Sequence, residues 1–110
     1  MRDRVAVKAL SSLAHEHRLK VFKILVRYGP EGITAGNIAK QLRLPPSSLS
    51  FHLSHLEASG LVRSWRRQRW IFYAIEVRKT QQLLRFLTED CCRDLPELYD
   101  GLKEMETACA

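Results

Sequence analysis

Apolar residues in the first quarter of the chain recur at intervals of three or four, the spacing that places side chains on one face of an α-helix. The first set is Val5, Ala9 and Leu13, and the second runs from Leu19 to Val26. A polar run, AHEHR, separates the two sets, and a run rich in turn-forming residues, YGPEG, ends the second. The pattern therefore predicts two consecutive helices, of which the first covers about residues 3–14.

Two shorter helical patterns follow over about residues 34–60. Thr34 stands where an N-terminal cap is expected, before an apolar stripe that contains Ile38 and Leu42. Two prolines, whose fixed backbone angle suits a first helical turn, open the second pattern, and Gly60 ends it. Its apolar stripe consists of Leu49, Leu53 and Leu56. Two short helices joined by a few residues predict a helix-turn-helix.

The period of the pattern changes after Gly60. Two segments rich in β-branched and aromatic residues, LVRSWRR and RWIFYAI, predict a β-hairpin over about residues 61–75, with Arg67 and Gln68 near its tip. Because the tip contains neither glycine nor asparagine, we expect a loop longer than two residues. A helical pattern returns over about residues 77–92, with Leu84, Leu87 and Cys91 on one stripe, and a tail covers residues 93–110. The expected fold is mainly α with a small β-hairpin.

The composition limits the class of protein. A chain of 110 residues, 45% apolar and 27% charged, fits one soluble domain over residues 1–110. No apolar run approaches the roughly 20 residues that span a bilayer, and the basic start MRDRVAVKAL has no signal-peptide pattern. We therefore expect a cytoplasmic protein with no membrane partner. A net charge of +6 favours an anionic partner, although many proteins are basic without one.

The chain has three cysteines, an odd number that argues against a disulfide framework. Cys91 and Cys92 do not suit a disulfide with each other, because adjacent Cα atoms lie about 3.8 Å apart and unstrained disulfides need about 4.4 Å or more. We expect these two side chains to be reduced thiols. No Cys-x-x-Cys motif and no phosphate-binding loop accompany them, so we do not expect an enzyme.

The segment PSSLSFHLSHLEASGLV resembles the recognition-helix signature of the ArsR/SmtB family of bacterial winged-helix repressors. The residues that carry this likeness are Ser50, His52, Leu53, Leu56, Gly60, Leu61 and Val62. Further likeness to the family lies in LAHEHRLKVFKIL, through Leu13, Ala14, Arg18, Leu19 and Leu25, and at Tyr73. The resemblance covers about residues 8–92. It implies a winged helix-turn-helix repressor that is dimeric through its first and last helices and binds an inverted repeat in double-stranded operator DNA.

Two groups of residues are candidates for contact with DNA. The exposed face of the expected recognition helix carries Ser47, Ser48, Ser50, Phe51 and His55. The wing carries Arg63, Arg66, Arg67 and Arg69, whose mutual repulsion would be relieved by phosphates. Alternatively, the first two serines cap the helix and the arginines form a solvated loop. We expect His52 to pack beside the leucine stripe, and Trp65 and Trp70 to pack the wing.

The metal sites common in the family are not expected in this chain. Its relatives place cysteines in the helix before the recognition helix, or histidines along the last helix, as zinc ligands. Here TAGNIAKQL contains no cysteine, and all four histidines precede the wing, so no zinc site is expected. His15 and His17 stand two residues apart, a spacing that does not share a helical face, and we do not expect them to bind a metal.

The run FLTEDCC resembles one found in an arsenic-responsive subgroup of the family, where a vicinal cysteine pair ends the last helix. Trivalent arsenic and antimony seek thiolates and favour three sulfur ligands, in keeping with the preference of soft ligands for soft metals. Cys91 and Cys92 supply two sulfurs, and the third is Cys109, the partner's Cys109 or an external thiol. The resemblance implies a repressor that releases operator DNA when the metalloid binds and distorts the last helix.

Other interpretations of the thiols remain open. A redox- or persulfide-sensing repressor of the same fold is one, because two close thiols and Cys109 can form a disulfide or polysulfide. Cys91 continues the stripe of Leu84 and Leu87, which also fits a small buried side chain, whereas Cys92 lies off that stripe. A winged helix that contacts only proteins is a further alternative, and the wing arginines argue against it.

Overall fold

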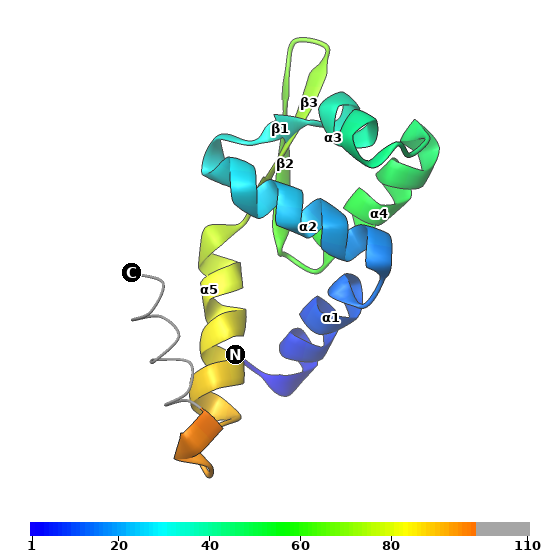
Figure 1. Cartoon of the computed structure of the whole chain (residues 1–110). Helices are drawn as coiled ribbons and strands as arrows, with labels where there is room; N and C mark the ends of the chain where they lie inside the picture. The colour runs from blue at the N-terminus through cyan, green and yellow to red at the C-terminus, as the bar shows by residue number, and fades with distance from the viewer. Residues whose placement is uncertain (99–110) are drawn as a thin grey trace.

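Helices make up most of the structure, a computed structural model that describes residues 1–98 (Figure 1). Two helices, α1 (Asp3–Leu13) and α2 (Glu16–Tyr28), open the chain, and a 3-10 turn, η1 (Gly29–Glu31), leads into β1 (Ile33–Thr34). Then come α3 (Ala35–Leu42) and α4 (Pro46–Ala58), the hairpin of β2 (Val62–Arg67) and β3 (Trp70–Ile75), α5 (Val77–Arg85) and a π-helical turn, η2 (Phe86–Asp90). This order confirms the mainly helical winged helix-turn-helix predicted from the sequence.

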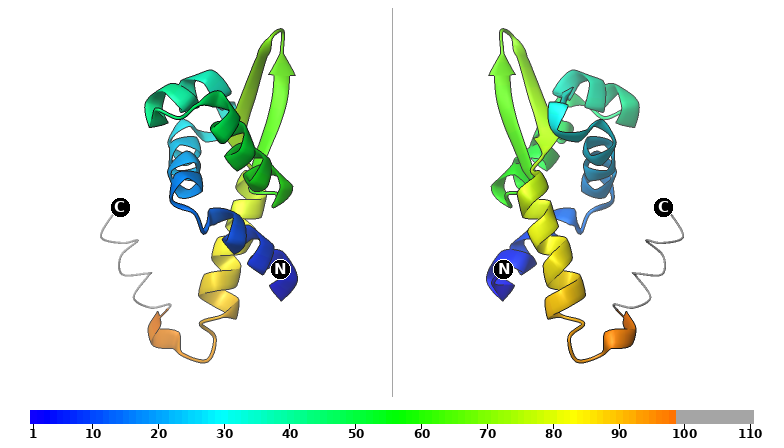
Figure 2. Two further views of the ribbon diagram at one scale, coloured as in Figure 1. Left: turned by 90° about the vertical axis from the view of Figure 1, so that its right-hand side faces the viewer. Right: turned by 90° about the vertical axis from the view of Figure 1, so that its left-hand side faces the viewer.

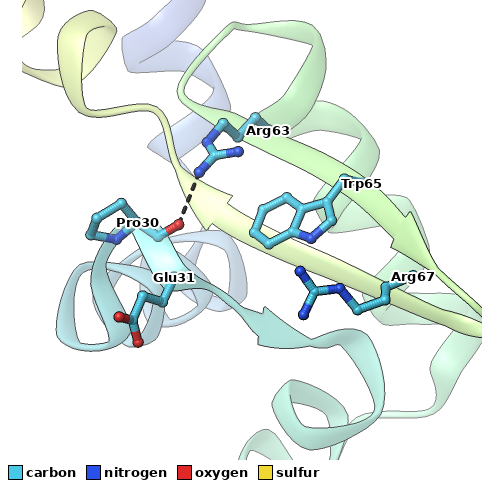
Figure 3. A pocket seen from close by; sticks show the side chains of 5 residues that line it. All are labelled: Pro30, Glu31, Arg63, Trp65 and Arg67. Carbon is cyan, nitrogen blue, oxygen red and sulfur yellow. Dashed lines mark hydrogen bonds between the residues drawn. The ribbon is translucent and has the colours of Figure 1, made fainter.

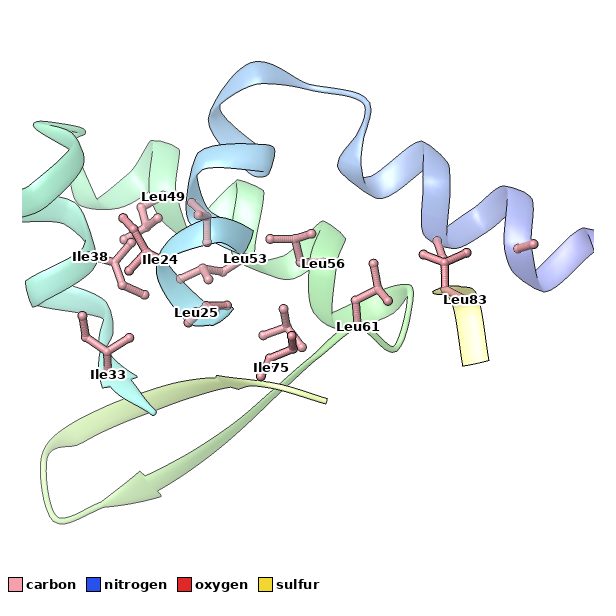
Figure 4. Close-up of a cluster of buried hydrophobic side chains, with 14 residues drawn as sticks. Ile24, Leu25, Ile33, Ile38, Leu49, Leu53, Leu56, Leu61, Ile75 and Leu83 are labelled. Atoms are coloured by element: carbon pink, nitrogen blue, oxygen red, sulfur yellow. The ribbon is translucent and has the colours of Figure 1, made fainter. Parts of the chain in front are cut away.

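The apolar stripes of the helices meet in one core (Figure 4). The buried side chains come from α1 to α5 and from the strands, and include Ala9, Val21, Ile24, Leu25, Ile33, Ile38, Leu49, Leu53, Leu56, Val62, Ile75 and Leu83. Each buried valine, leucine or isoleucine side chain stabilises the fold by about 1.5–3 kcal/mol relative to its exposed state. The core therefore holds α4 in a fixed orientation and leaves its opposite face in solvent.

Local hydrogen bonds set the ends of α3. Thr34 caps its start, because the Thr34 Oγ1 accepts a hydrogen bond of 3.3 Å from the backbone N–H of Asn37. At its end Arg43 adopts a left-handed backbone with φ of 55°, and its N–H bonds to the Ala39 and Lys40 carbonyls. The predicted cap is confirmed, and the left-handed residue lets the chain turn sharply into α4.

The sheet has the strand order β1-β3-β2, all antiparallel. The sequence predicts β2 and β3 but not β1, which at two residues is too short to display an alternating pattern. The expectation of a long hairpin loop is wrong, since Arg67 pairs with Trp70 and only two residues connect the strands. Gln68 supplies the turn by adopting φ of 58°, a conformation that glycine or asparagine adopts more readily.

The last helix ends earlier than the sequence predicts. α5 stops at Arg85, and η2 widens the following turn, so that the Cys91 N–H bonds to the Phe86 carbonyl at 3.0 Å. The predicted stripe is also displaced, because Leu83 is buried while Leu84 is 57% exposed. Figure 2 shows the hairpin of β2 and β3 projecting at one end of the molecule and α5 leading to the other end.

Two of the three cysteines of the chain lie at this end. Cys91 and Cys92 follow η2 instead of lying within the helix. Cys109 lies outside the described residues. Within residues 1–98, no helix is both long enough and apolar enough to cross a lipid bilayer.

Candidate nucleic-acid interface and thiol pair

The outer face of α4 carries the residues predicted to contact DNA. Ser47, Ser50, Phe51 and His55 are exposed, and Ser48 is partly exposed. No side chain caps the N-terminus of α4, so the alternative that the two first serines serve as caps is wrong. Phe51 is 59% exposed, and its ring meets that of His55 at a centroid separation of 4.6 Å. The face thus presents hydroxyls and an aromatic edge on a rigid helix.

His52 points the other way, into the protein. It is only 7% exposed, which confirms the prediction that it packs with the leucine stripe. Burial lowers its pKa, and the neighbouring charges of His15, Arg18, His17 and His55 lower the pKa further. A neutral imidazole is therefore favoured in the folded protein, and His52 is not placed to contact DNA.

The structure contradicts the reasoning that His15 and His17 cannot share a site. His15 is not part of a helix but the N-cap of α2, and its Nδ1 accepts a hydrogen bond of 3.1 Å from the His17 backbone N–H. Both side chains meet His52, with ring centroids 4.6 Å from His15 and 5.6 Å from His17. Helical spacing fails as a guide here because one of the residues precedes the helix and the third comes from α4.

The hairpin divides its arginines between two faces, because successive side chains of a strand point to opposite sides. Arg63, Trp65 and Arg67 of β2 share one face and, with Pro30 and Glu31, line a hollow of about 580 Å³ (Figure 3). The Arg63 Nη2 donates a hydrogen bond of 2.9 Å to the Pro30 carbonyl, and its guanidinium lies 4.6 Å from the Trp65 ring centroid. Arg63 thus already has partners within the protein.

Arg66 belongs to the opposite face of β2, the face that turns toward α4. Its neighbour on that face, Ser64, donates a hydrogen bond of 2.6 Å to the Glu57 carboxylate of α4. Arg66, Arg67 and Arg69 are exposed at the far end of the hairpin. The sequence does not single out Glu57, which fixes the hairpin to α4.

The two tryptophans differ in their surroundings. Trp65 stacks on Phe72 with a centroid separation of 5.7 Å and an interplanar angle of 10°, as expected for a residue that packs the wing. Trp70 is 50% exposed, and the Arg69 guanidinium lies 5.3 Å from its ring centroid. The prediction that Trp70 packs the wing is therefore wrong, and its ring extends the exposed surface at the tip.

The burial of the two neighbouring cysteines is the reverse of that inferred from the apolar stripe. Cys91 is exposed, whereas Cys92 is half-buried and donates an S–H hydrogen bond of 3.1 Å to the Leu87 carbonyl. Cys92 also lines a hollow of about 320 Å³ with Thr88, Glu89, Arg93 and Pro96. The early end of α5 causes this reversal, because residues beyond η2 no longer follow the helical stripe.

Comparison with known proteins places the chain among transcriptional regulators. A helix-turn-helix domain family matches residues 13–64. The chain is 27% identical to the transcriptional activator HlyU of Vibrio cholerae over 88 residues, which are 80% of this chain and 79% of HlyU. It is 32% identical to the nodulation protein NolR of Rhizobium meliloti over 85 residues, 77% of this chain and 67% of NolR.

Solved structures agree with the fold. Reduced HlyU from Vibrio cholerae superposes with a TM-score of 0.63 and 26% identity, covering 76% of this chain and 85% of that one. An ArsR-like transcriptional regulator from Rhodococcus sp. RHA1 superposes with a TM-score of 0.72 and 22% identity, covering 93% of this chain and 92% of that one. At 22% identity, the second structure supports the fold alone.

Proposed function

We propose that this chain, which belongs to the same family of winged helix-turn-helix transcriptional regulators as NolR, is an ArsR-type repressor that releases operator DNA when its thiols bind trivalent arsenic or antimony. The observation that carries the proposal is the position of the thiol pair. Cys91 and Cys92 are adjacent and follow the last helix, and one of their sulfurs is open to solvent.

The proposed DNA surface combines α4 with the tip of the hairpin. Exposed hydroxyls and Phe51 on α4 suit hydrogen bonds and apolar contact in the major groove. Arg66, Arg67 and Arg69 suit phosphates or a narrow minor groove beside it. Arg63 has a smaller part in this proposal, because its guanidinium is held by Pro30 and Trp65.

A homodimer built from α1 and α5 would present two such surfaces to an inverted repeat. Apolar side chains remain exposed on both helices, among them Val7 at 61% and Leu84 at 57%. Exposed large apolar side chains that gather on neighbouring helices are typical of a surface that a second subunit covers. Two-fold symmetric dimers that bind palindromic sites are the usual arrangement for this kind of domain.

Metalloid binding would require a rearrangement at the end of α5. Both sulfurs must reach one centre as thiolates, so the S–H of Cys92 must give up its hydrogen bond to the Leu87 carbonyl. That hydrogen bond helps to hold the segment that follows η2. A π-helical turn such as η2 is an irregularity of the helix that frequently occurs at functional sites. If α5 forms the dimer interface, its altered end changes the spacing of the two DNA-binding surfaces. A coupling of about 1–3 kcal/mol between the sites is typical of such regulators.

The test is a titration of the DNA-bound, full-length protein with arsenite, followed by fluorescence anisotropy of labelled operator DNA. We expect the wild type to release DNA and the double variant Cys91→Ser, Cys92→Ser to bind DNA equally well without release. Cys109→Ser is the matched control. Partial loss of arsenite sensitivity in this control assigns Cys109 as third ligand, and full sensitivity assigns the third sulfur elsewhere. Release from the double variant would refute the proposal.

A thiol-based redox or persulfide sensor is the second candidate, and one observation favours it. The HlyU structure to which this chain is similar is described as the reduced form of that protein. In this chain, Cys91 and Cys92 would have to join Cys109 or take up extra sulfur atoms, because a direct bond between adjacent cysteines is strained. Treating the DNA complex separately with arsenite, peroxide and a persulfide distinguishes the two functions by which reagent releases the DNA.

A further inference from the structure

We propose that His15, His17 and His52 form a binding site for a divalent transition metal ion that favours imidazole, such as Zn²⁺. The site joins the N-terminus of α2 to the inner face of α4. It is separate from Cys91 and Cys92, which follow η2 beyond the end of α5 (Figure 1).

The geometry brings one ring nitrogen from each of the three histidines together. These ligand atoms all lie within 4.8 Å of one another. In a tetrahedral zinc site, metal–nitrogen bonds of about 2.0–2.1 Å place the nitrogens about 3.3 Å apart. Small rotations of the exposed His15 and the half-buried His17 rings toward His52 are therefore sufficient to form the site.

The burial of His52 and its unpaired ring nitrogen are an independent observation that points to a ligand. Its side chain is only 7% exposed, yet within residues 1–98 its Nδ1 has no hydrogen-bond partner. Buried polar atoms are nearly always paired, so an unpaired one calls for an explanation.

The chemistry of the cluster selects the class of metal. Imidazole nitrogen suits zinc, copper and nickel, whereas calcium and magnesium prefer oxygen ligands. Among the described residues the cluster contains no carboxylate or thiolate. The carboxylate of Glu16, which lies between His15 and His17 in the sequence, instead pairs with Lys20 at a distance of 3.5 Å between Oε1 and Nζ. Three histidine ligands leave the fourth position of a tetrahedral ion to water.

His15 has two roles that can be separated. Its Nδ1 caps α2 by accepting the His17 N–H, which leaves Nε2 as the nitrogen available to a metal. Asparagine is a preferred N-cap residue but is not an imidazole ligand. The variant His15→Asn therefore keeps the cap and removes the ligand, and His17→Gln removes a second ligand without disturbing the buried His52.

Cobalt binding tests the proposal on full-length protein in which the three cysteines are replaced by serine, so that thiols do not compete. We expect Co²⁺ to give visible d–d absorption without a thiolate charge-transfer band, and Zn²⁺ to displace the Co²⁺ and raise the melting temperature. His15→Asn and His17→Gln should each weaken binding by at least about tenfold, since even indirect supporting residues cost that much. His55→Gln, a neighbouring histidine outside the cluster, is the matched control and should bind normally.

Two outcomes would overturn the inference. One is the absence of the d–d band in the cysteine-free protein at Co²⁺ concentrations that saturate ordinary imidazole sites. The other is metal binding that survives in both His15→Asn and His17→Gln. Arsenite release measured on the same histidine variants in the cysteine-containing protein separates this site from the thiol site, since it should be unchanged.

Discussion

Gly32 occupies a position where the chain passes too close to its neighbours for any side chain. Its φ is 84°, and a Cβ atom would lie 2.6 Å from the Trp65 Cη2 and 2.9 Å from the Tyr73 carbonyl oxygen. This contact sets Trp65 against the start of β1 and thereby fixes the base of the hairpin. The sequence marks Gly32 only as part of a turn, because the close approach involves residues from β2 and β3.

Replacing Gly32 with alanine should therefore lower the free energy of unfolding by about 2–6 kcal/mol. The backbone conformation of Gly32, with φ of 84° and ψ of 179°, is one that essentially only glycine adopts and costs another residue about 1–3 kcal/mol, and overpacking adds about 1–3 kcal/mol. Denaturant unfolding measures the change. Gly36→Ala is the matched control, because nothing lies within 4 Å of that position and alanine stabilises a helix interior by about 0.5–1 kcal/mol. Equal stability of the two variants would contradict the packing described at Gly32.

At the scale of single elements, the hairpin shows how strand alternation sorts charges that look equivalent in the sequence. The four arginines fall within seven positions, and the sequence alone treats them as one basic cluster. The strand register places Arg63 and Arg67 on one face and Arg66 on the other, with Arg69 in the two-residue loop. Arg63 binds the Pro30 carbonyl, whereas the guanidinium groups of Arg66, Arg67 and Arg69 form no hydrogen bond or ion pair within residues 1–98.

This division predicts different effects on DNA binding for Arg66→Gln and Arg63→Gln. Loss of one phosphate contact should weaken binding of Arg66→Gln and reduce the slope of log affinity against log salt by about 0.9. The Arg63→Gln variant should keep the wild-type slope and instead lose about 1 kcal/mol of stability, since its main partners are within the protein. Anisotropy titrations at several salt concentrations measure the slopes for both variants. A reduced slope for Arg63→Gln would refute the assignment of Arg63 to contacts within the protein.

The end of α5 is the other element that the sequence describes incompletely. Its hydrophobic period favours one continuous helix through Cys91, and a π-helical turn instead replaces the last part. Thr88 takes part in this change, because its Oγ1 donates a hydrogen bond of 2.9 Å to the Leu84 carbonyl. Side chains that bond to preceding carbonyls often bend helices, which is a local cause that periodicity does not register.

At the scale of the whole molecule, the apolar surface of α1 and α5 predicts an effect of mutation on assembly. Leu84→Glu places a charge in the proposed dimer interface, so the variant should sediment as a monomer. Its affinity for an inverted repeat should fall roughly 100-fold or more, because binding of one subunit no longer holds a second DNA-binding surface close to the other half-site. Sedimentation velocity and DNA titration measure both effects.

Val26→Glu is the control for this prediction. Val26 is 51% exposed on α2, comparable to Leu84, but it lies outside the proposed interface of α1 and α5. This variant should remain dimeric and bind DNA normally. If Leu84→Glu also stays dimeric, the proposed interface is wrong, whereas loss of the dimer in both variants would place the interface more broadly over the surface.

The sequence by itself determines the order of the helices and of the hairpin, and the faces that α2 and α4 bury. Val21, Leu25, Leu49 and Leu53 reveal those faces because helical periodicity depends only on near neighbours in the chain. Thr34 marks a helix start for the same local reason. The sequence also supplies the adjacency of Cys91 and Cys92, which is covalent.

The tertiary structure alone shows which distant side chains meet. His52 joins His15 and His17 only because α4 packs across the start of α2, and Arg63 reaches Pro30 only because β2 passes η1. The two-residue turn at Gln68 likewise follows from strand pairing that tolerates a less favourable loop residue. These contacts depend on the packing of whole elements against one another, and a pattern with a period of a few residues carries no record of that packing.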